Sequence, residues 1–221
     1  MAKADSDVAS QFTVQVVGDD ASVRSSLDRL FGSAGHTVRT FDTALAYLEE
    51  SSPDEPGCVV LDIEMPGMDG LALQKRMSER GFNAPIVFIS GHADVAQSVR
   101  AMKNGAVDFL EKPFHDQDLL DAVGRAIELD TALRRQREES AQTMRGLERL
   151  TSREYEVMTH VIAGSLNKVI AQELEVTEKT VKVHRGRVMK KMGARSLAEL
   201  VRMTERAGIE GAQPNDYGGV V

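Results

Sequence analysis

The strongest constraint on the fold is a regular alternation of short apolar runs and longer amphipathic segments between residue 13 and about residue 129. Four runs are short and rich in β-branched residues, as in strands buried on both faces of a parallel sheet: 13–17, 58–61, 86–89 and 107–110. Residues 36–41 alternate polar and apolar positions and are predicted to form an edge strand. Segments with helical spacing lie between and after the runs, at 23–34, 43–50, 71–80, 95–104 and 116–129. This pattern predicts an α/β fold with a doubly wound, five-stranded parallel sheet whose functional loops follow the strands.

Charge is distributed unevenly along the 221 residues. The first 150 residues carry 16 basic and 25 acidic side chains, whereas the remaining 71 carry 11 basic and 9 acidic ones. Nine of those 11 basic residues fall between positions 177 and 206. An acidic first part and a basic second part predict two domains with different partners, the second partner being a polyanion.

Composition excludes several classes of protein. The single cysteine, Cys58, rules out a disulfide framework and a Cys-rich zinc site, and its apolar strand predicts a buried thiol. Aromatic residues make up 5% and Trp is absent, which argues against stacking platforms for single-stranded nucleic acid. No apolar run approaches the roughly 18 residues of a membrane span, and residues 1–11 lack a signal-peptide core. We therefore expect a cytoplasmic protein without a membrane partner.

The predicted domain boundaries follow these patterns. Residues 12–130 form the α/β domain and residues 131–147 a helical linker, which is polar all round at 134–142. A solvated helix is the favoured interpretation of the linker, and a coiled-coil pairing element is the alternative. A small all-α domain of four helices follows at 148–207, and the tail 208–221 is predicted to be disordered.

Polar side chains follow four of the five predicted strands. Carboxylates come after the first and third strands, a hydroxyl after the fourth and an ammonium after the fifth: Asp19, Asp20, Asp62, Glu64, Ser90 and Lys112. Carboxylates from neighbouring strand ends suit Mg²⁺, which takes one or two of them together with phosphate oxygens and water. A hydroxyl and an ammonium would complete a cradle for a phosphoryl group, with Asp62 as the nucleophile that forms an acyl phosphate.

These residues resemble those of a response-regulator receiver domain (a flavodoxin-like or CheY-like fold). The stretches SGHAD at 90–94 and VRAMKNGAVDFLEKPF at 99–114 resemble the FixJ-type subgroup. The resemblance implies that a histidine kinase phosphorylates Asp62, and that Ser90, Lys112 and the rotating aromatic Phe109 respond to the phosphoryl group. It also implies that Mg²⁺ or Mn²⁺ is held by three groups: Asp19, Asp62 and the main-chain carbonyl of Glu64.

One position departs from the receiver pattern. Gly18 stands where such receivers carry the first of two acidic residues, and Asp20 is a further candidate ligand. Gly18 therefore favours a second hypothesis, in which the first domain dimerises without being phosphorylated.

The second domain is predicted to contain helices at 153–163, 167–173, 178–192 and 197–207. Thr151 and Glu154 form a capping box before the first helix. The second helix, the turn 174–177 and the basic third helix read as a helix-turn-helix.

Angular positions divide the third helix into two faces. Val181, Val188 and Met192 fall on one side and are predicted to be core. Lys182 on the opposite side could bind guanine edges or phosphate, Val183 could contact a thymine methyl, and Gly186 would allow close approach. The remaining DNA-binding candidates are Lys179, His184, Arg185, Arg187 and Lys190, with Lys191 as a further phosphate contact. The alternative is a basic, solvated helix in a protein-binding bundle.

The second domain resembles the LuxR/NarL-type output domain. The resemblance rests on LTSRE at 150–154, GSLNKVIA at 164–171, TVKVHR at 180–185 and KMGARSLAEL at 191–200. Together the two domains resemble a FixJ-type transcriptional response regulator. This implies a histidine kinase, a double-stranded DNA operator, a homodimer formed on phosphorylation and RNA polymerase as partners.

An enzymatic function is a third hypothesis. A haloacid-dehalogenase-like phosphatase also uses an Asp nucleophile at a strand end, but it requires Asp two residues later and Thr or Val two residues beyond that. Glu64 and Pro66 occupy these positions, so a turnover enzyme is not expected.

Overall fold

The computed structural model describes residues 12–92 and 94–212. The chain divides into two compact units, one ending at Leu133 and the other beginning at Arg134. Each unit has its own buried core, in agreement with the two domains expected from the sequence.

The first unit is built on a five-stranded parallel sheet with the strand order β2-β1-β3-β4-β5. The strands are β1 (Thr13–Val17), β2 (Thr37–Phe41), β3 (Gly57–Asp62), β4 (Ile86–Ser90) and β5 (Asp108–Glu111). β3 and β4 are buried along their whole length, as continuous apolar runs predict. β5 is only half-buried, because it is the second edge strand of the sheet and not an interior one as its composition indicated.

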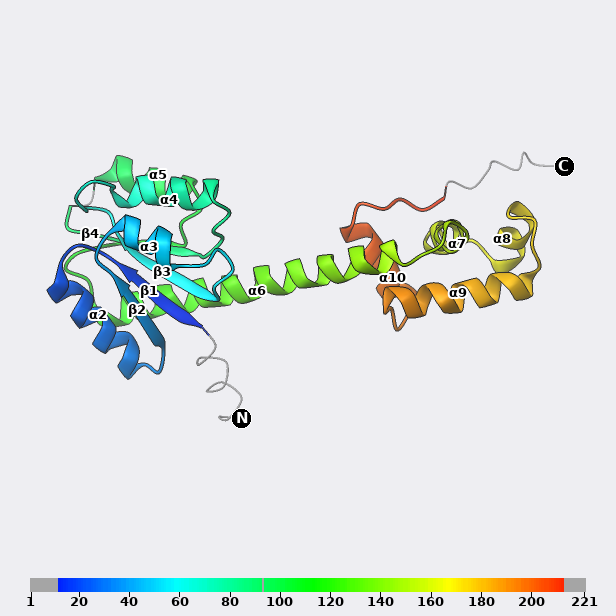
Figure 1. The fold of residues 1–221 in the computed structure, drawn as a ribbon, viewed down its shortest axis with the longest axis horizontal. Coiled ribbons are helices and arrows are strands. Elements are labelled where there is room, and N and C mark those ends of the chain that lie inside the picture. Colours follow the sequence, from blue (N-terminus) through cyan, green and yellow to red (C-terminus); the bar gives the residue numbers. More distant parts are fainter. Residues whose placement is uncertain (1–11, 93, 213–221) are drawn as a thin grey trace. The chain divides into compact units, whose positions relative to one another are not determined.

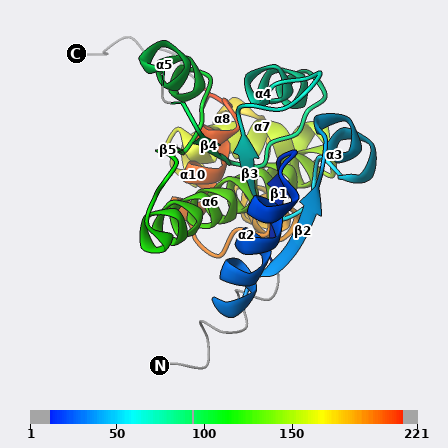
Figure 2. The same ribbon diagram turned by 90° about the vertical axis from the view of Figure 1, so that its left-hand side faces the viewer.

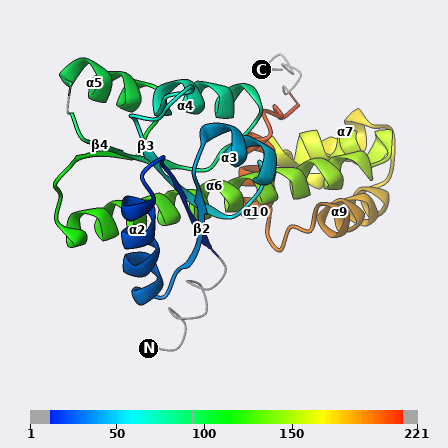
Figure 3. The ribbon, with the colours of Figure 1, turned by 60° about the vertical axis from the view of Figure 1, so that its left-hand side comes forward.

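Helices cover both faces of this sheet. They are α2 (Ala21–Ser33), α3 (Ala44–Glu50), α4 (Gly70–Glu79), α5 (Val95–Lys103) and α6 (Asp116–Glu148). α3, α4 and α5 lie on one face, and α2 and the beginning of α6 lie on the other (Figures 2 and 3). Side chains of Asp20, Thr43, Asp69 and Asp94 cap the N-termini of α2 to α5, which fixes where each helix begins after its strand.

Cys58 lies within the core beneath α2 and α6. Burial, together with a smaller effect of the nearby Asp130 carboxylate, raises the pKa of its thiol to about 12. Such a thiol is not ionised near neutral pH, so the expectation of a small buried hydrophobe agrees with the structure.

The second unit contains α7 (Ser152–Ile162), α8 (Asn167–Glu173), α9 (Glu178–Met192) and α10 (Leu197–Arg206) (Figure 1). All four helices agree with their predicted ranges within one residue at each end. The capping box before α7 is present: Thr151 accepts from the Glu154 amide, and the Glu154 carboxylate accepts from the Thr151 amide. The turn between α8 and α9 places Glu175 in the left-handed region, with φ 53°.

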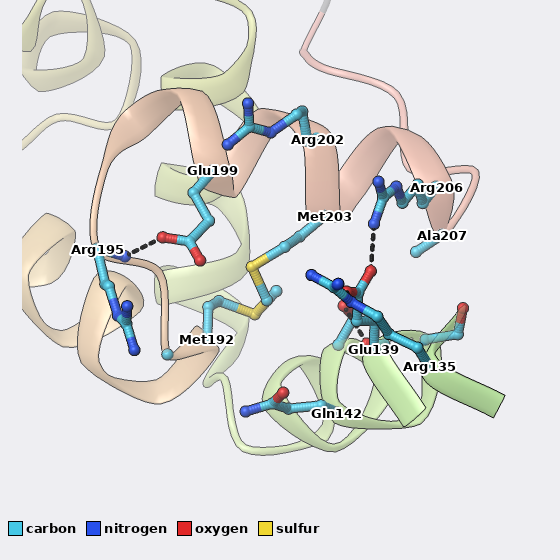
Figure 4. A pocket seen from close by; sticks show the side chains of 13 residues that line it. Arg135, Glu139, Gln142, Met192, Arg195, Glu199, Arg202, Met203, Arg206 and Ala207 are labelled. Atoms are coloured by element: carbon cyan, nitrogen blue, oxygen red, sulfur yellow. Dashed lines mark hydrogen bonds and ion pairs between the residues drawn. The ribbon is translucent and has the colours of Figure 1, made fainter. Parts of the chain in front are cut away.

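The end of α6 belongs to the second unit. α6 is continuous to Glu148, but Thr143 is only 4% exposed and Gly146 is buried. A Cβ added at Gly146 would lie 3.1 Å from the Cα atom of Met192 at the end of α9. Figure 4 shows Glu139 of α6 between Arg135 and Arg206, with its Oε1 3.0 Å from Arg135 Nε. The polar stretch 134–142, predicted to be a solvated helix, is mostly exposed, whereas the small residues that follow it let the end of α6 pack closely against α9.

The predicted disordered tail begins too early. Residues 208–212 are ordered, with Ile209 packed on the core and the Ala212 amide donating to the Thr159 carbonyl at 3.0 Å. The apolar side chain of Ile209 provides the buried surface that holds this segment. Residues 213–221 lie outside the described part of the chain.

Within residues 12–92 and 94–212, none of the helices combines the length and the apolar composition needed to cross a membrane.

Candidate functional site

The carboxyl ends of four adjacent strands bring the predicted phosphorylation residues to one edge of the sheet. The register aligns Val17 of β1 with Leu61 of β3, Asp62 with Ile89 of β4, and Ser90 with Glu111 of β5. Residues that follow these strands are therefore neighbours in space although they are distant in sequence.

Asp62 is the centre of this edge. It is the last residue of β3 and only 4% exposed, and Lys112 Nζ lies 2.6 Å from its Oδ2 atom. Its Oδ1 atom accepts a hydrogen bond from the main-chain amide of Glu64 at 3.1 Å. A charged partner and an amide donor stabilise a carboxylate in this buried position.

The loop after β1 supplies the remaining carboxylates. Asp19 is exposed, whereas Asp20 caps α2 by accepting from the amides of Ser22 and Val23. These two hydrogen bonds to Oδ1 of Asp20 hold the start of α2 in place. Asp19 makes no hydrogen bond or ion pair with the residues that the structure describes, so it is the better candidate ligand.

Gly18 lies beside Asp62, where a side chain would make contact without a clash. A Cβ added at Gly18 would lie 3.4 Å from Asp62 Cβ and 3.8 Å from Asp62 Oδ2, which are ordinary contact distances. Its φ angle is not positive, so the backbone does not require glycine here. The fold would therefore accept the acidic side chain that receivers usually carry at this position.

The donor set fits a divalent cation of the Mg²⁺ type. Among the described residues no group of three or more His, Cys, Asp or Glu side chains could hold a metal ion. Mg²⁺ nevertheless requires only one or two carboxylates when phosphate oxygens and water complete its shell. Asp19, Asp62 and the Glu64 carbonyl offer oxygen ligands of that kind.

Ser90 and Phe109 lie beside this centre. Ser90 is fully buried, and its hydroxyl donates to the His92 carbonyl at 2.8 Å and accepts from the His92 amide at 3.2 Å. Phe109 is half-buried on β5, aligned with Phe88 of β4. Ser90 therefore belongs to the strand next to that of Asp62, and Phe109 to the strand beyond it.

Two features near Asp62 were not predicted. His92 Nδ1 lies 3.1 Å from Glu64 Oε1, so two exposed side chains meet across adjacent loops. Gly70 allows α4 to approach β3, because a Cβ there would lie 2.4 Å from the Asp62 carbonyl oxygen. Nothing in the sequence indicates that His92 and Glu64 meet. Gly70 could have been noticed, because it directly follows the capping residue Asp69.

The second candidate site is the exposed face of α9. Val181, Val188 and Met192 are buried, as predicted. The opposite residues are exposed: Lys179, Lys182, Val183, Gly186, Arg187 and Lys190. A Cβ at Gly186 would meet no atom within 4 Å, so nothing in the protein itself requires glycine there.

Two other candidates on α9, Arg185 and Lys191, have partners within the protein, and His184 is partly covered. Arg185 Nη1 donates to Asn167 Oδ1 of α8 at 2.8 Å, and His184 is half-buried. Lys191 Nζ lies 2.5 Å from Glu154 Oε2 and donates to the Arg149 carbonyl at 2.9 Å. Lys191 is thus an internal ion-pair partner, and its role as a phosphate contact stays a prediction.

The ion pair with Lys191 has a clear electrostatic effect on Glu154. Hydrogen bonds from Lys191 and from the Thr151 amide lower the pKa of this carboxyl to about 2. The pair joins the start of α7 to the end of α9 and so stabilises the second unit.

A five-stranded parallel receiver-type sheet with an Asp–Lys pair at its carboxyl edge, joined to a helix-turn-helix unit with a basic exposed helix, defines a DNA-binding response regulator. Comparisons with known proteins agree. Residues 14–124 match the response regulator receiver domain family, and residues 148–204 match the luxR family of bacterial regulatory proteins. The chain belongs to the response regulators that carry a receiver domain and a LuxR-type output domain.

Relatives are similar over nearly the whole chain. Nodulation protein W of Bradyrhizobium diazoefficiens is 50% identical over 200 residues, which cover 89% of this chain and 86% of the relative. The transcriptional regulatory protein FixJ of the same organism is 43% identical over 196 residues, covering 89% and 96%. The solved structure of the response regulator StyR is 47% identical with a TM-score of 0.80, covering 89% of this chain and all of StyR.

These findings establish a two-component transcriptional regulator, not a turnover enzyme, so the phosphatase alternative is wrong. Membership implies a histidine kinase as the partner of the receiver domain and DNA as the ligand of the helix-turn-helix.

Proposed function

We propose that a histidine kinase transfers a phosphoryl group to Asp62, and that this transfer switches dimerisation and sequence-specific DNA binding. The observation that carries the proposal is the 2.6 Å contact between Lys112 Nζ and Asp62 Oδ2 at the strand ends. It places a nucleophilic carboxylate beside a cation in a site with little solvent exposure.

The transfer step forms one bond and breaks another. An Asp62 carboxylate oxygen attacks phosphorus, the P–N bond to the kinase histidine breaks, and the imidazole leaves with that electron pair and takes up a proton. Lys112 is positioned to neutralise charge on the phosphoryl oxygens, and the Glu64 amide orients the Asp62 carboxylate.

A divalent cation fits the same edge. Asp19, Asp62 and the Glu64 carbonyl would hold Mg²⁺ or Mn²⁺, which would neutralise negative charge as the phosphoryl group approaches. Asp19 would serve only as a ligand, because Asp62 alone combines burial with the Lys112 contact.

The signal would pass through Ser90 and Phe109. Ser90 would turn from the His92 carbonyl toward the phosphoryl oxygens, and Phe109 would move into the space that Ser90 leaves. Four residues separate the end of β4 from α5, which carries exposed Val95, Val99 and Met102, with Val95 75% exposed. These three apolar residues at helical spacing support a dimer contact through α5.

On DNA, α9 would enter the major groove. Lys182 and Val183 would contact base edges, while Lys179, Arg187 and Lys190 would contact phosphates. Two such units in a homodimer would match a two-fold operator, and RNA polymerase would be the next partner at the promoter.

The proposal is tested by incubating the full chain with Mg²⁺ and acetyl phosphate. We expect an acyl phosphate that hydroxylamine releases, formed in the wild type and lost in Asp62→Asn. The control is Asp69→Asn, which alters a capping carboxylate of the same region. Phosphate incorporation that persists in Asp62→Asn would overturn the assignment.

Gly18 favours a second candidate function, in which the receiver acts as a dimerisation module without phosphorylation. The space beside Asp62 lacks the carboxylate usual in receivers, which weakens cation binding. Absence of acyl phosphate together with intact dimerisation and DNA binding would favour this second function.

A further inference from the structure

Gln74 is a buried polar residue between two helices of the first unit. It lies on α4, is 5% exposed, and is flanked by Leu73 and Met77, which are 0% and 1% exposed. α4 and α5 lie side by side on the same face of the sheet (Figures 1 and 3). A long polar side chain in this place has to find hydrogen-bond partners within the protein.

Its partners are the main-chain carbonyls at the end of α5. Gln74 Nε2 donates to the Ala101 oxygen at 3.2 Å and to the Asn104 oxygen at 3.3 Å. The Ala101 carbonyl also accepts from the Ala106 amide at 3.1 Å, so Gln74 is a second donor to it. The Asn104 carbonyl follows the last turn of α5, where helix carbonyls lack partners within the helix, and Gln74 supplies a donor there. The two bonds tie α4 to one end of α5.

The other half of the amide is not satisfied. Gln74 Oε1 is buried and accepts no hydrogen bond from the described residues. An unpaired buried oxygen costs stability, and an apolar side chain of the same shape would avoid that cost. The arrangement is therefore poorly explained by packing alone.

α5 is held at both ends. Its beginning follows the Ser90 loop, where Asp94 caps the helix, and its last turn is held by Gln74. Between these ends lie Val95, Val99 and Met102, the exposed residues of the dimer contact in the proposed function. A displacement of α5 away from α4 stretches both Gln74 bonds.

We propose that Gln74 is a positioning residue that holds the last turn of α5 against α4 and so sets how readily α5 rearranges for dimerisation. This inference rests on the proposed role of α5 in the switch. The bonds favour the arrangement of α5 seen in this structure over any other, so removing them shifts the equilibrium toward the alternative.

The test is Gln74→Met in the full chain, since Met keeps the length of the side chain and lacks the donor. Dimerisation constants are measured by analytical ultracentrifugation with and without Mg²⁺ and beryllofluoride, a phosphoryl mimic. We expect the dimer Kd without the mimic to fall by about tenfold and the Kd with the mimic to change less than about twofold.

Two controls separate positioning from stability. Gln117→Met makes the same chemical change at an exposed site on α6. Leu27→Val weakens the core on the opposite face of the sheet without touching α4 or α5. Both controls are expected to leave the two dimer Kd values unchanged.

The outcomes distinguish this inference from the proposed function. If Gln74→Met lowers thermal stability and leaves both Kd values unchanged, or shifts both equally, the positioning role is overturned. If the wild-type Kd does not respond to the mimic while Gln74→Met still tightens the resting dimer, the phosphorylation switch fails and the role of Gln74 stands.

Discussion

Lys112 Nζ lies 2.6 Å from Asp62 Oδ2, across 50 residues of sequence. The contact exists because β3 and β5 both flank β4 in a parallel sheet, so their carboxyl ends reach the same edge. It joins a buried carboxylate to the ammonium that would stabilise a phosphoryl group at that carboxylate. The remaining site residues are arranged around this pair.

Gly18→Asp is expected to strengthen cation binding. The fold has room for a side chain at this position, and a carboxylate there adds negative charge beside Asp62. Mg²⁺ affinity measured by isothermal titration calorimetry should rise about tenfold, or about 1.4 kcal/mol. Gly32→Asp on α2, where a Cβ would meet no atom within 4 Å, is the control away from Asp62 and should change little. Equal affinity in wild type and Gly18→Asp would show that position 18 does not contribute to the cation site.

Gly186→Ala should have opposite effects on stability and on DNA binding. Alanine favours a helix over glycine by about 0.5–1 kcal/mol, and the added methyl meets no atom of the protein. On DNA the same methyl would stand between α9 and the groove, so Kd should rise about tenfold. Gly124→Ala on α6 is the control, with similar stabilisation and unchanged DNA affinity. If Gly186→Ala is stabilised and still binds DNA with the wild-type affinity, then Gly186 does not face the groove.

Lys182→Ala distinguishes base recognition from phosphate contact. If the exposed ammonium reads a base edge, the change should weaken binding to a selected duplex by about 1–3 kcal/mol and affect random DNA much less. Fluorescence anisotropy on a duplex selected from a random pool and on an unselected duplex measures both. Equal losses on the two duplexes would assign Lys182 to phosphate, and Lys75→Ala on the exposed side of α4 serves as the control.

The lowered pKa of Glu154 predicts that the second unit becomes less stable at acidic pH. Its pKa is lowered from 4.5 to about 2, so the native state favours the charged form more than the unfolded state does. The stabilisation is complete above pH 4.5 and is lost as the pH falls toward 2. The difference in unfolding free energy between wild type and Glu154→Gln, from urea titrations, should therefore shrink over this range. A difference that stays constant with pH would contradict the assigned ion pair with Lys191.

Much of the fold could be predicted from local sequence. Apolar runs and helix caps such as Asp69 and Asp94 are local signals, so strands and helices were placed within a few residues. The juxtaposition of Asp62 and Lys112 followed from parallel topology, because such sheets collect strand ends at one edge. The roles of the residues there came from the resemblance to receivers and remain proposals.

Contacts that depend on tertiary packing gave no local signal. The pairing of Lys191 with Glu154 spans 37 residues, and a lysine on a basic helix is indistinguishable in sequence from a phosphate contact. The polar segment at 134–142 suggested a solvated linker, yet Thr143 and Gly146 just beyond it allow close packing on α9. The Gln74 bonds to α5 likewise depend on how two helices are brought together by the sheet.

The most direct test of the central claim measures DNA affinity before and after phosphorylation of one protein preparation. A duplex selected from a random pool by the full chain is titrated with untreated protein, with protein treated with acetyl phosphate and Mg²⁺, and with Asp62→Asn treated in the same way. We predict tighter binding only for the treated wild type, by about tenfold or more. Identical affinities in all three titrations would contradict a switch that operates through Asp62.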